Sequence, residues 1–322
     1  MTAAPAAGST APGPPRRVLL TGWYSFLHGE ATAGDVLAGE AVEAALRKAS
    51  IRYDVAWSPR FRPAALSLDR VDPSRYSHLV FACGPVHSCP PGPGLPAPLA
   101  ELHHRFAHCR RIAVGVSVPD PADRAVTGFH TLLARDAPLL PPVPDLALAA
   151  PRPAEVPVLA VLLTQGQREY GDRRRHDLVT GAVVEWLRGV GAARLPLDTR
   201  LDADDWRMCS TPAQLRALLS RADALVTTRL HGLVLGLEAG VPVLAVDPVA
   251  GGAKVSAQAR VLGWPALLPA ERAGPEELAG LLRWCLSAAG RDTARRFPAG
   301  GDSALLGALV TELTAGPGRA DP

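Results

Sequence analysis

Short apolar segments alternate along this chain with longer segments in which apolar residues recur at helical spacing. The run at 18–22 (Val-Leu-Leu-Thr-Gly) ends in glycine and predicts a buried strand. Residues 36–49 repeat apolar side chains every three or four positions, with Asp35 as the predicted N-cap of a helix. Further strands are predicted at 52–57, 78–83 and 112–117, and a helix at 98–109. This order predicts a parallel sheet with helices on both faces.

The same rhythm starts again after a stretch at 136–155 that is dense in proline and suits a crossing between domains. The second series predicts strands at 156–163, 193–197, 224–228 and 241–246, and helices at 177–190, 212–221, 233–239, 275–289 and 303–314. We therefore expect an α/β protein with two doubly wound (Rossmann-like) domains facing a cleft. The expected ranges are 16–150 and 151–315, with a disordered tail at 1–15.

Composition and charge exclude several classes of function. A formal net charge of +3 over 322 residues gives no broad positive field for nucleic acid. No apolar run approaches the ~20 residues that span a bilayer, and the chain start lacks the apolar stretch of a secretory signal, so we expect a cytoplasmic protein. The five cysteines are widely spaced, and we predict neither a disulfide framework nor a metal site, although His104 and His108 would share a helix face. No cofactor is indicated.

The segment 224–247 (ALVTTRLHGLVLGLEAGVPVLAVD) carries the most informative chemistry. Arg229 and His231 are its only charged or titratable residues before Glu238, and both fall where a strand ends and a helix begins. Free backbone N–H groups and the positive end of the helix dipole favour an anion there. Arg229 could hold a phosphate or carboxylate, His231 could exchange a proton near neutral pH, and Gly232 would leave room for close approach. The alternative is an arginine paired with an acid and a histidine satisfied in the core.

Lysine is nearly absent from this chain. Among 34 lysine and arginine residues, only Lys48 and Lys254 are lysine. Lys254 is predicted to lie in a glycine-rich loop after the next predicted strand, so it could reach the same anion as Arg229. Lys48 falls near the C-terminal end of a predicted helix, where a cation suits the dipole. The chain uses arginine for almost all of its basic residues, and Lys254 could equally be a chance exception to that bias.

The run at 228–232 (Thr-Arg-Leu-His-Gly), the small apolar helix after it, Gly-Val-Pro-Val and a downstream Lys-Val resemble the C-terminal motif of the polysaccharide pyruvyl transferase family. Weaker similarities extend the resemblance over most of 18–255: Gly34-Asp35, Arg135-Asp136, Asp145 and Ala222-Asp223. The resemblance implies a two-domain GT-B-like fold and a transferase. It would move a pyruvyl group from phosphoenolpyruvate to hydroxyls of a sugar or glycoconjugate as a ketal, with Arg229, Leu230 and His231 lining the donor site.

The residues suit that donor and suggest roles. Phosphoenolpyruvate carries a phosphate and a carboxylate, which Arg229, the helix start and Lys254 complement in charge. Ketal formation needs a proton at the methylene carbon, and His231 is our candidate general acid. Asp35, in the N-terminal domain on the acceptor side, would orient or deprotonate an acceptor hydroxyl, although a simple helix cap explains it equally well.

Two departures from the family pattern concern the acceptor side. Ala-Cys-Gly-Pro at 82–85 stands where the family tends to have a glycine cluster, and an apolar segment at 137–141 replaces a serine that commonly follows Arg-Asp. Two other functions stay open. One is a GT-B glycosyltransferase that uses a nucleotide sugar, with Asp247 or Glu238 near the ribose. The other is a non-catalytic descendant that binds an anionic metabolite or partner.

Overall fold

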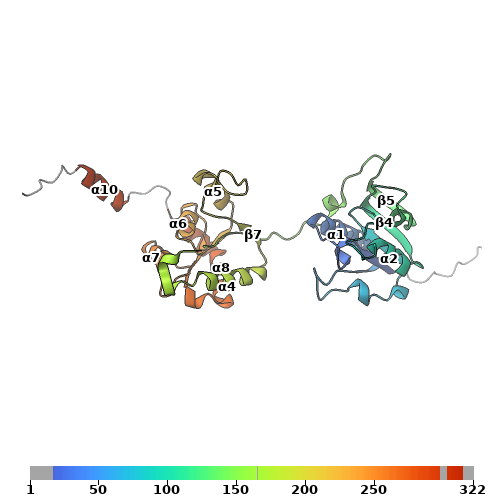
Figure 1. Ribbon diagram of the computed structural model, residues 1–322, viewed down its shortest axis with the longest axis horizontal. Coiled ribbons are helices and arrows are strands. Elements are labelled where there is room, and N and C mark those ends of the chain that lie inside the picture. The colour runs from blue at the N-terminus through green and yellow to red at the C-terminus, as the bar shows by residue number, and fades with distance from the viewer. Residues whose placement is uncertain (1–16, 165, 298–302, 315–322) are drawn as a thin grey trace, which may run out of the picture. The chain divides into compact units, whose positions relative to one another are not determined.

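The computed structural model describes residues 17–164, 166–297 and 303–314, and the chain divides into two units, Met1–Pro153 and Ala154–Pro322 (Figure 1). The tail predicted at 1–15 lies outside the described residues. Among the described residues, no helix combines the length and the apolar character needed to cross a membrane.

The N-terminal unit is built on a parallel sheet. Its described residues form five strands in the order β2-β1-β3-β4-β5, and each neighbouring pair is parallel. The strands are β1 (Arg17–Thr21), β2 (Arg52–Val55), β3 (His78–Ala82), β4 (Arg110–Ser117) and β5 (Thr131–Asp136), and the helices are α1 (Ala33–Lys48), α2 (Pro98–Arg105) and α3 (Arg124–Thr127).

Successive side chains of β1 point to opposite faces of this sheet, and each face has its own core. Val18 and Leu20 belong to a cluster against which Val42 of α1 packs. Leu19 belongs to a second cluster that contains Leu102 of α2. Both faces are therefore buried, which explains why the strand is apolar at successive positions.

The C-terminal unit repeats the design. Its described residues also form a five-stranded parallel sheet, in the order β10-β9-β8-β6-β7. The strands are β6 (Val158–Leu162), β7 (Ala193–Pro196), β8 (Ala224–Thr227), β9 (Val243–Asp247) and β10 (Leu267–Pro269), and the helices are α4 (His176–Arg188), α5 (Pro212–Leu219), α6 (Leu230–Glu238), α7 (Lys254–Val261), α8 (Pro275–Cys285), α9 (Ala288–Ala294) and α10 (Ala304–Thr314).

Five helices of this unit form two groups. Helix α4 contacts α8, whereas α6 contacts both α5 and α7 (Figure 1). Right-handed crossovers between parallel strands place these groups on opposite faces. In both sheets the first strand of the unit lies between its second and third strands: β1 lies between β2 and β3, and β6 lies between β7 and β8. The predicted class, α/β with two doubly wound parallel sheets, is confirmed.

The prediction that Asp35 caps α1 is wrong. Helix α1 begins at Ala33, and its N-cap is Thr32. The Thr32 hydroxyl accepts a hydrogen bond from the Asp35 amide (3.1 Å) and donates one to the Asp35 carboxylate (2.7 Å). Threonine and aspartate both cap helices well. The sequence analysis missed the first turn of α1 because residues 32–35 do not continue the apolar repeat of the helix.

Other boundaries also differ from the predictions. Helix α6 begins at Leu230 rather than at 233, so His231 lies inside it. Helix α2 ends at Arg105, so His108 is not on its face with His104. Across the described ranges, no group of three or more His, Cys, Asp or Glu side chains is placed to hold a metal ion. The sequence patterns did not predict α3, β5, α7, β10 or α9, which are short or carry weak apolar periodicity.

Replacing Gly232 by alanine is expected to destabilise the C-terminal unit by about 1–3 kcal/mol. The added methyl group would overlap the Thr227 hydroxyl and lie 2.9 Å from Thr227 Cβ. Gly181→Ala is the matched control, because no atom lies within 4 Å of its added methyl group inside α4, and a gain of about 0.5–1 kcal/mol is expected. Urea denaturation measures both changes. Equal effects of the two substitutions would contradict the close contact at Gly232.

Candidate functional site

Hydroxyl groups build the turn between β8 and α6. Thr227, the last residue of β8, donates from Oγ1 to the Leu162 carbonyl (2.8 Å) and accepts from the Arg229 amide (3.0 Å). The Thr164 amide donates to the Thr228 hydroxyl (2.7 Å). These bonds join the ends of β6 and β8 and fix the point at which the chain leaves the sheet.

Strands β6 and β8 are neighbours at which the chain reverses its direction across the sheet. From β6 the chain crosses to β7 on one side, and it later returns to β8 on the other side. Such a reversal leaves a crevice at the carboxyl ends of the two strands, and ligands of open parallel sheets bind there. The loop after β6 and the start of α6 border this crevice.

A pocket of about 210 Å³ occupies the crevice. It is lined by Thr164, Gln167, Thr199, Arg229, Leu230, His231 and Lys254. The structure thus brings together Arg229, Leu230, His231 and Lys254, as the sequence analysis expected for a donor site. Thr164, Gln167 and Thr199 were missed because they come from the loops after β6 and β7, where no motif marks them.

Arg229, the N-cap of α6, already has an acidic partner. Its Nη1 lies 3.0 Å from a carboxylate oxygen of Asp198 and donates to the Thr199 hydroxyl at 2.8 Å. The arginine side chain is 25% exposed, so a ligand in the pocket can still reach it. The alternative of an arginine paired with an acid is therefore what the structure shows, and an anion would share this guanidinium with Asp198.

His231 is the second residue of α6 and is exposed. Within the described part of the chain, no group forms a hydrogen bond with its imidazole. It is therefore not a histidine satisfied in the core. Its side chain also borders an adjoining pocket of about 120 Å³ that contains Leu201, Leu215 and Leu235. His231 therefore borders both a polar pocket and a small, mainly apolar one.

Lys254 is the first residue of α7, not a loop residue, and Asp247 arranges the turn before it. The buried Asp247 carboxylate accepts hydrogen bonds from the amides of Ala253 (2.7 Å) and Ser256 (2.8 Å). The Lys254 ammonium lies 5.8 Å from the centre of the Tyr170 ring, which is cation–π distance. Backbone and aromatic contacts together hold the lysine at the pocket.

Both acids considered for a ribose are engaged elsewhere. Asp247 is buried and bonded to the backbone of its own loop. Glu238 forms an ion pair with Arg216 at 2.9 Å. Neither carboxylate is therefore available for the nucleotide-sugar role that the sequence left open.

A buried histidine supports Gln167 at the wall of the pocket. His176 is fully buried, and its Nε2 lies 2.9 Å from the Gln167 Oε1. Burial lowers the pKa of His176, and its Nδ1 is buried without a partner among the described residues. A neutral His176 that donates from Nε2 fixes the Gln167 amide so that its NH₂ group is left to bind a ligand. The Tyr170 ring stacks on the imidazole at 6.4 Å.

Asp35 and Gly232 do not line this pocket. Gly232 is buried and packs against Thr227. Asp35 borders a pocket of about 500 Å³ in the N-terminal unit, formed by the loops after β1 and β3 at the corresponding strand reversal. In that pocket the Trp23 ring stacks on His87 at 4.8 Å.

The loop after β3 contains the segment 82–85, which departs from the family pattern. Cys83 has φ 63° and Gly84 has φ 73°, so both adopt the left-handed conformation that favours glycine. A cysteine therefore occupies a backbone position at which glycine is the less strained residue. Burial raises the pKa of the Cys83 thiol to about 11, so the thiol is protonated at neutral pH.

Comparisons with known proteins give several similarities to solved structures and one family match. The chain is similar to the calicheamicin glycosyltransferase CalG4 (15% identity, covering 95% of this chain and 99% of that chain, TM-score 0.33) and to MurG of Acinetobacter baumannii (12%, 92% and 100%, TM-score 0.33). It is also similar to a UDP-GlcNAc 2-epimerase of Methanocaldococcus jannaschii (9%, 94% and 100%, TM-score 0.31). A search of curated proteins found no match.

The family model described as polysaccharide pyruvyl transferase matches residues 142–248. This segment contains β6, β8, α6 and most of the pocket, whereas Lys254 and Asp35 lie outside it. The match confirms the resemblance that the Arg-Leu-His-Gly run suggested. The match covers residues 142–248 of the 322, so it is this segment that resembles a family of transferases.

Proposed function

We propose that this chain transfers a pyruvyl group from phosphoenolpyruvate to two hydroxyls of a sugar or glycoconjugate, forming a ketal. The observation that carries the proposal is the pocket that joins Arg229, His231 and Lys254 within and beside the family domain. Two cations and a histidine around one small pocket suit a compact, multiply charged donor.

The donor's two anionic groups have separate partners in this pocket. The guanidinium of Arg229 can bind one of them bidentately, sharing its N–H groups with Asp198. The Lys254 ammonium offers a point charge for the other. The Gln167 amide and the Thr199 hydroxyl add neutral donors on the same wall.

His231, whose imidazole is exposed and which lines the pocket, is the candidate for proton transfer. In the reaction, a proton adds to the methylene carbon and an acceptor hydroxyl oxygen bonds to the adjacent carbon. The bond from that carbon to the phosphate oxygen breaks, a second hydroxyl bonds to the carbon, and inorganic phosphate leaves with the remaining proton. His231 would supply the first proton as the general acid, which contributes about 10²–10⁴ in rate when the acid is well placed.

The N-terminal unit is the proposed acceptor side. Asp35 borders its pocket and accepts hydrogen bonds from the Thr32 hydroxyl and the Cys83 thiol, and a carboxylate can take a further one from an acceptor hydroxyl. The stacked Trp23 and His87 rings offer a flat aromatic face beside it. A sugar ring with several hydroxyls suits an aromatic wall next to a carboxylate.

Two competing functions differ from this one in measurable ways. A nucleotide-sugar transferase would need a free acid for the ribose. The two acids considered for that role, Asp247 and Glu238, are both engaged elsewhere. A non-catalytic protein would bind phosphoenolpyruvate without releasing phosphate. Calorimetry with phosphoenolpyruvate and nucleotide sugars, followed by a screen of sugar acceptors for the added pyruvyl mass, separates the three. Absence of phosphoenolpyruvate binding at millimolar concentration would overturn the proposal.

Replacing His231 by alanine is expected to reduce turnover by about 10²–10⁴-fold while leaving donor affinity within a few fold. Arg229→Gln should have the opposite signature and weaken donor binding about 10–100-fold, because it removes hydrogen bonds to a charged ligand. Calorimetry and phosphate release measure the two effects, with Arg283→Gln on the exposed face of α8 as the control. A fully active His231→Ala enzyme would refute the acid role.

Replacing Lys254 by arginine keeps the charge and is expected to lower kcat/KM about tenfold or more. The guanidinium is larger and planar, whereas the site places a compact ammonium between Tyr170 and the pocket. Lys48→Arg is the matched control, because Lys48 is the chain's other lysine and lies exposed at the end of α1. Unchanged steady-state kinetics in Lys254→Arg would remove this lysine from the donor site.

The lowered pKa of His176 predicts an acid-sensitive C-terminal unit. The unfolded chain binds a proton on this side chain below about pH 6.5, whereas the folded chain does so only at lower pH. Stability should therefore fall as pH drops below 6.5, by at most about 1.4 kcal/mol per pH unit from this group. Urea denaturation at pH 7.5 and 5.5 should show a smaller loss in His176→Gln than in the wild type, and identical losses would contradict the assignment.

A further inference from the structure

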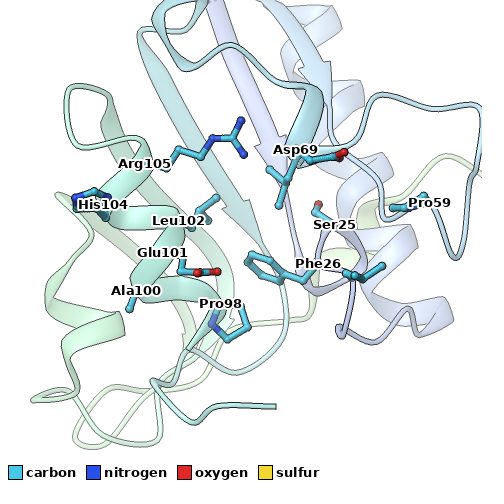
Figure 2. Close-up of a pocket in the computed structure, with 12 residues that line it drawn as sticks. Ser25, Phe26, Pro59, Asp69, Pro98, Ala100, Glu101, Leu102, His104 and Arg105 are labelled. Atoms are coloured by element: carbon cyan, nitrogen blue, oxygen red, sulfur yellow. The ribbon is translucent and has the colours of Figure 1, made fainter. Parts of the chain in front are cut away.

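The N-terminal unit contains a second and larger cavity, which the proposed reaction does not use. Its volume is about 1040 Å³. Figure 2 shows α2 on one side of it and the segments that carry Phe26, Pro59 and Asp69 on the other. These segments follow β1 and β2, so the cavity lies beside the carboxyl ends of the strands, where open parallel sheets bind ligands.

The walls of this cavity are mainly apolar. Phe26 and Leu102 are buried at its base, and Leu68, Pro59 and Pro98 extend the apolar surface. Leu27 stands at the rim and is 53% exposed. A large apolar hollow with an exposed leucine at its edge is typical of a site for an organic molecule rather than for an ion.

The polar groups around the cavity differ in how far they are already bonded. The Ser25 hydroxyl is used internally, because it donates to the Ala56 carbonyl at 2.6 Å. Arg105 donates to the Val71 carbonyl at 2.5 Å, which holds its guanidinium to the protein backbone. Neither group is therefore left entirely to a ligand.

One carboxylate is freer. Glu101 forms no ion pair or hydrogen bond with any side chain in the described ranges, and Figure 2 shows its carboxylate extending toward the Phe26 ring. The hydroxyl of Ser67 lowers the pKa of Asp69, so this carboxyl is ionised at neutral pH. His104 also lines the cavity, and Arg60 donates to the Leu27 carbonyl at its rim (3.5 Å), so Glu101 is the acidic group whose carboxylate is left for a ligand.

We propose that this cavity binds an organic molecule with an apolar ring system and a protonated amine, which sits against the Glu101 carboxylate. The apolar part would cover Phe26, Leu27 and Leu102, and its burial would supply most of the affinity. The amine would supply selectivity through a charge-assisted hydrogen bond. A carboxylate on the same ring would be repelled.

Pro98 also lines the pocket that contains Asp35, so the two cavities share a wall. A ligand that extends past Pro98 would bring its next group to Asp35. In that case the apolar amine is the non-sugar part of the acceptor, an assignment that rests on the proposed function. The binding of the amine to this cavity does not depend on the proposed function.

Three naphthalene probes of one ring size test the inference: naphthylmethylamine, naphthylmethanol and naphthoic acid. Calorimetry on the full chain should give the tightest binding for the amine and the weakest for the acid. Glu101→Gln should weaken the amine about fivefold and leave the alcohol unchanged. Leu27→Ala should weaken the amine and the alcohol equally, which places both in this cavity, whereas Glu40→Gln on α1 should change neither.

The inference is overturned if no probe binds at millimolar concentration, if the acid binds as well as the amine, or if Glu101→Gln leaves the preference unchanged. These outcomes are independent of the proposed reaction, because the probes are tested without phosphoenolpyruvate. Conversely, a failure of phosphoenolpyruvate to bind would overturn the proposed function and leave the preference for amines as measured.

Discussion

The hydroxyl of Thr227 is the contact on which the C-terminal pocket depends. It joins the Leu162 carbonyl of β6 to the Arg229 amide at the start of α6, and Gly232 packs directly against it. One side chain thus fixes two strands and a helix relative to each other. Because each helical residue turns the chain by about 100°, a start displaced by one position would rotate His231 away from the pocket.

The two units use one topology for different chemistry. In each, the first strand lies between the second and the third, which leaves a crevice at the reversal. In the C-terminal unit the crevice carries Arg229 and Lys254, whereas in the N-terminal unit it carries Asp35 beside stacked aromatic rings. The sheet therefore determines where a ligand binds, and the loop residues determine which ligand it is.

The sequence predicted most strands and helices because both sheet faces are buried and the strands are continuously apolar. It also predicted the meeting of Arg229, His231 and Lys254, because parallel strands end at one edge of the sheet. Asp198 could not be predicted, because its contact with Arg229 joins loops that are distant along the chain. Gln167 could not be predicted for another reason. Its orientation depends on His176, and the sequence around this histidine does not indicate that it is buried.

The pairing of Arg229 with Asp198 decides how an anion can enter. A fully buried pair would cost several kcal/mol to separate, because each charge would lose its only partner. Here the two side chains are 25% and 29% exposed, and pairs in contact with water are worth about 0–1 kcal/mol. A ligand with a phosphate and a carboxylate offers more charge than one aspartate and can therefore take over part of the guanidinium. Between binding events Asp198 and Thr199 keep the arginine extended along the pocket wall, so the ligand meets a side chain that is already ordered.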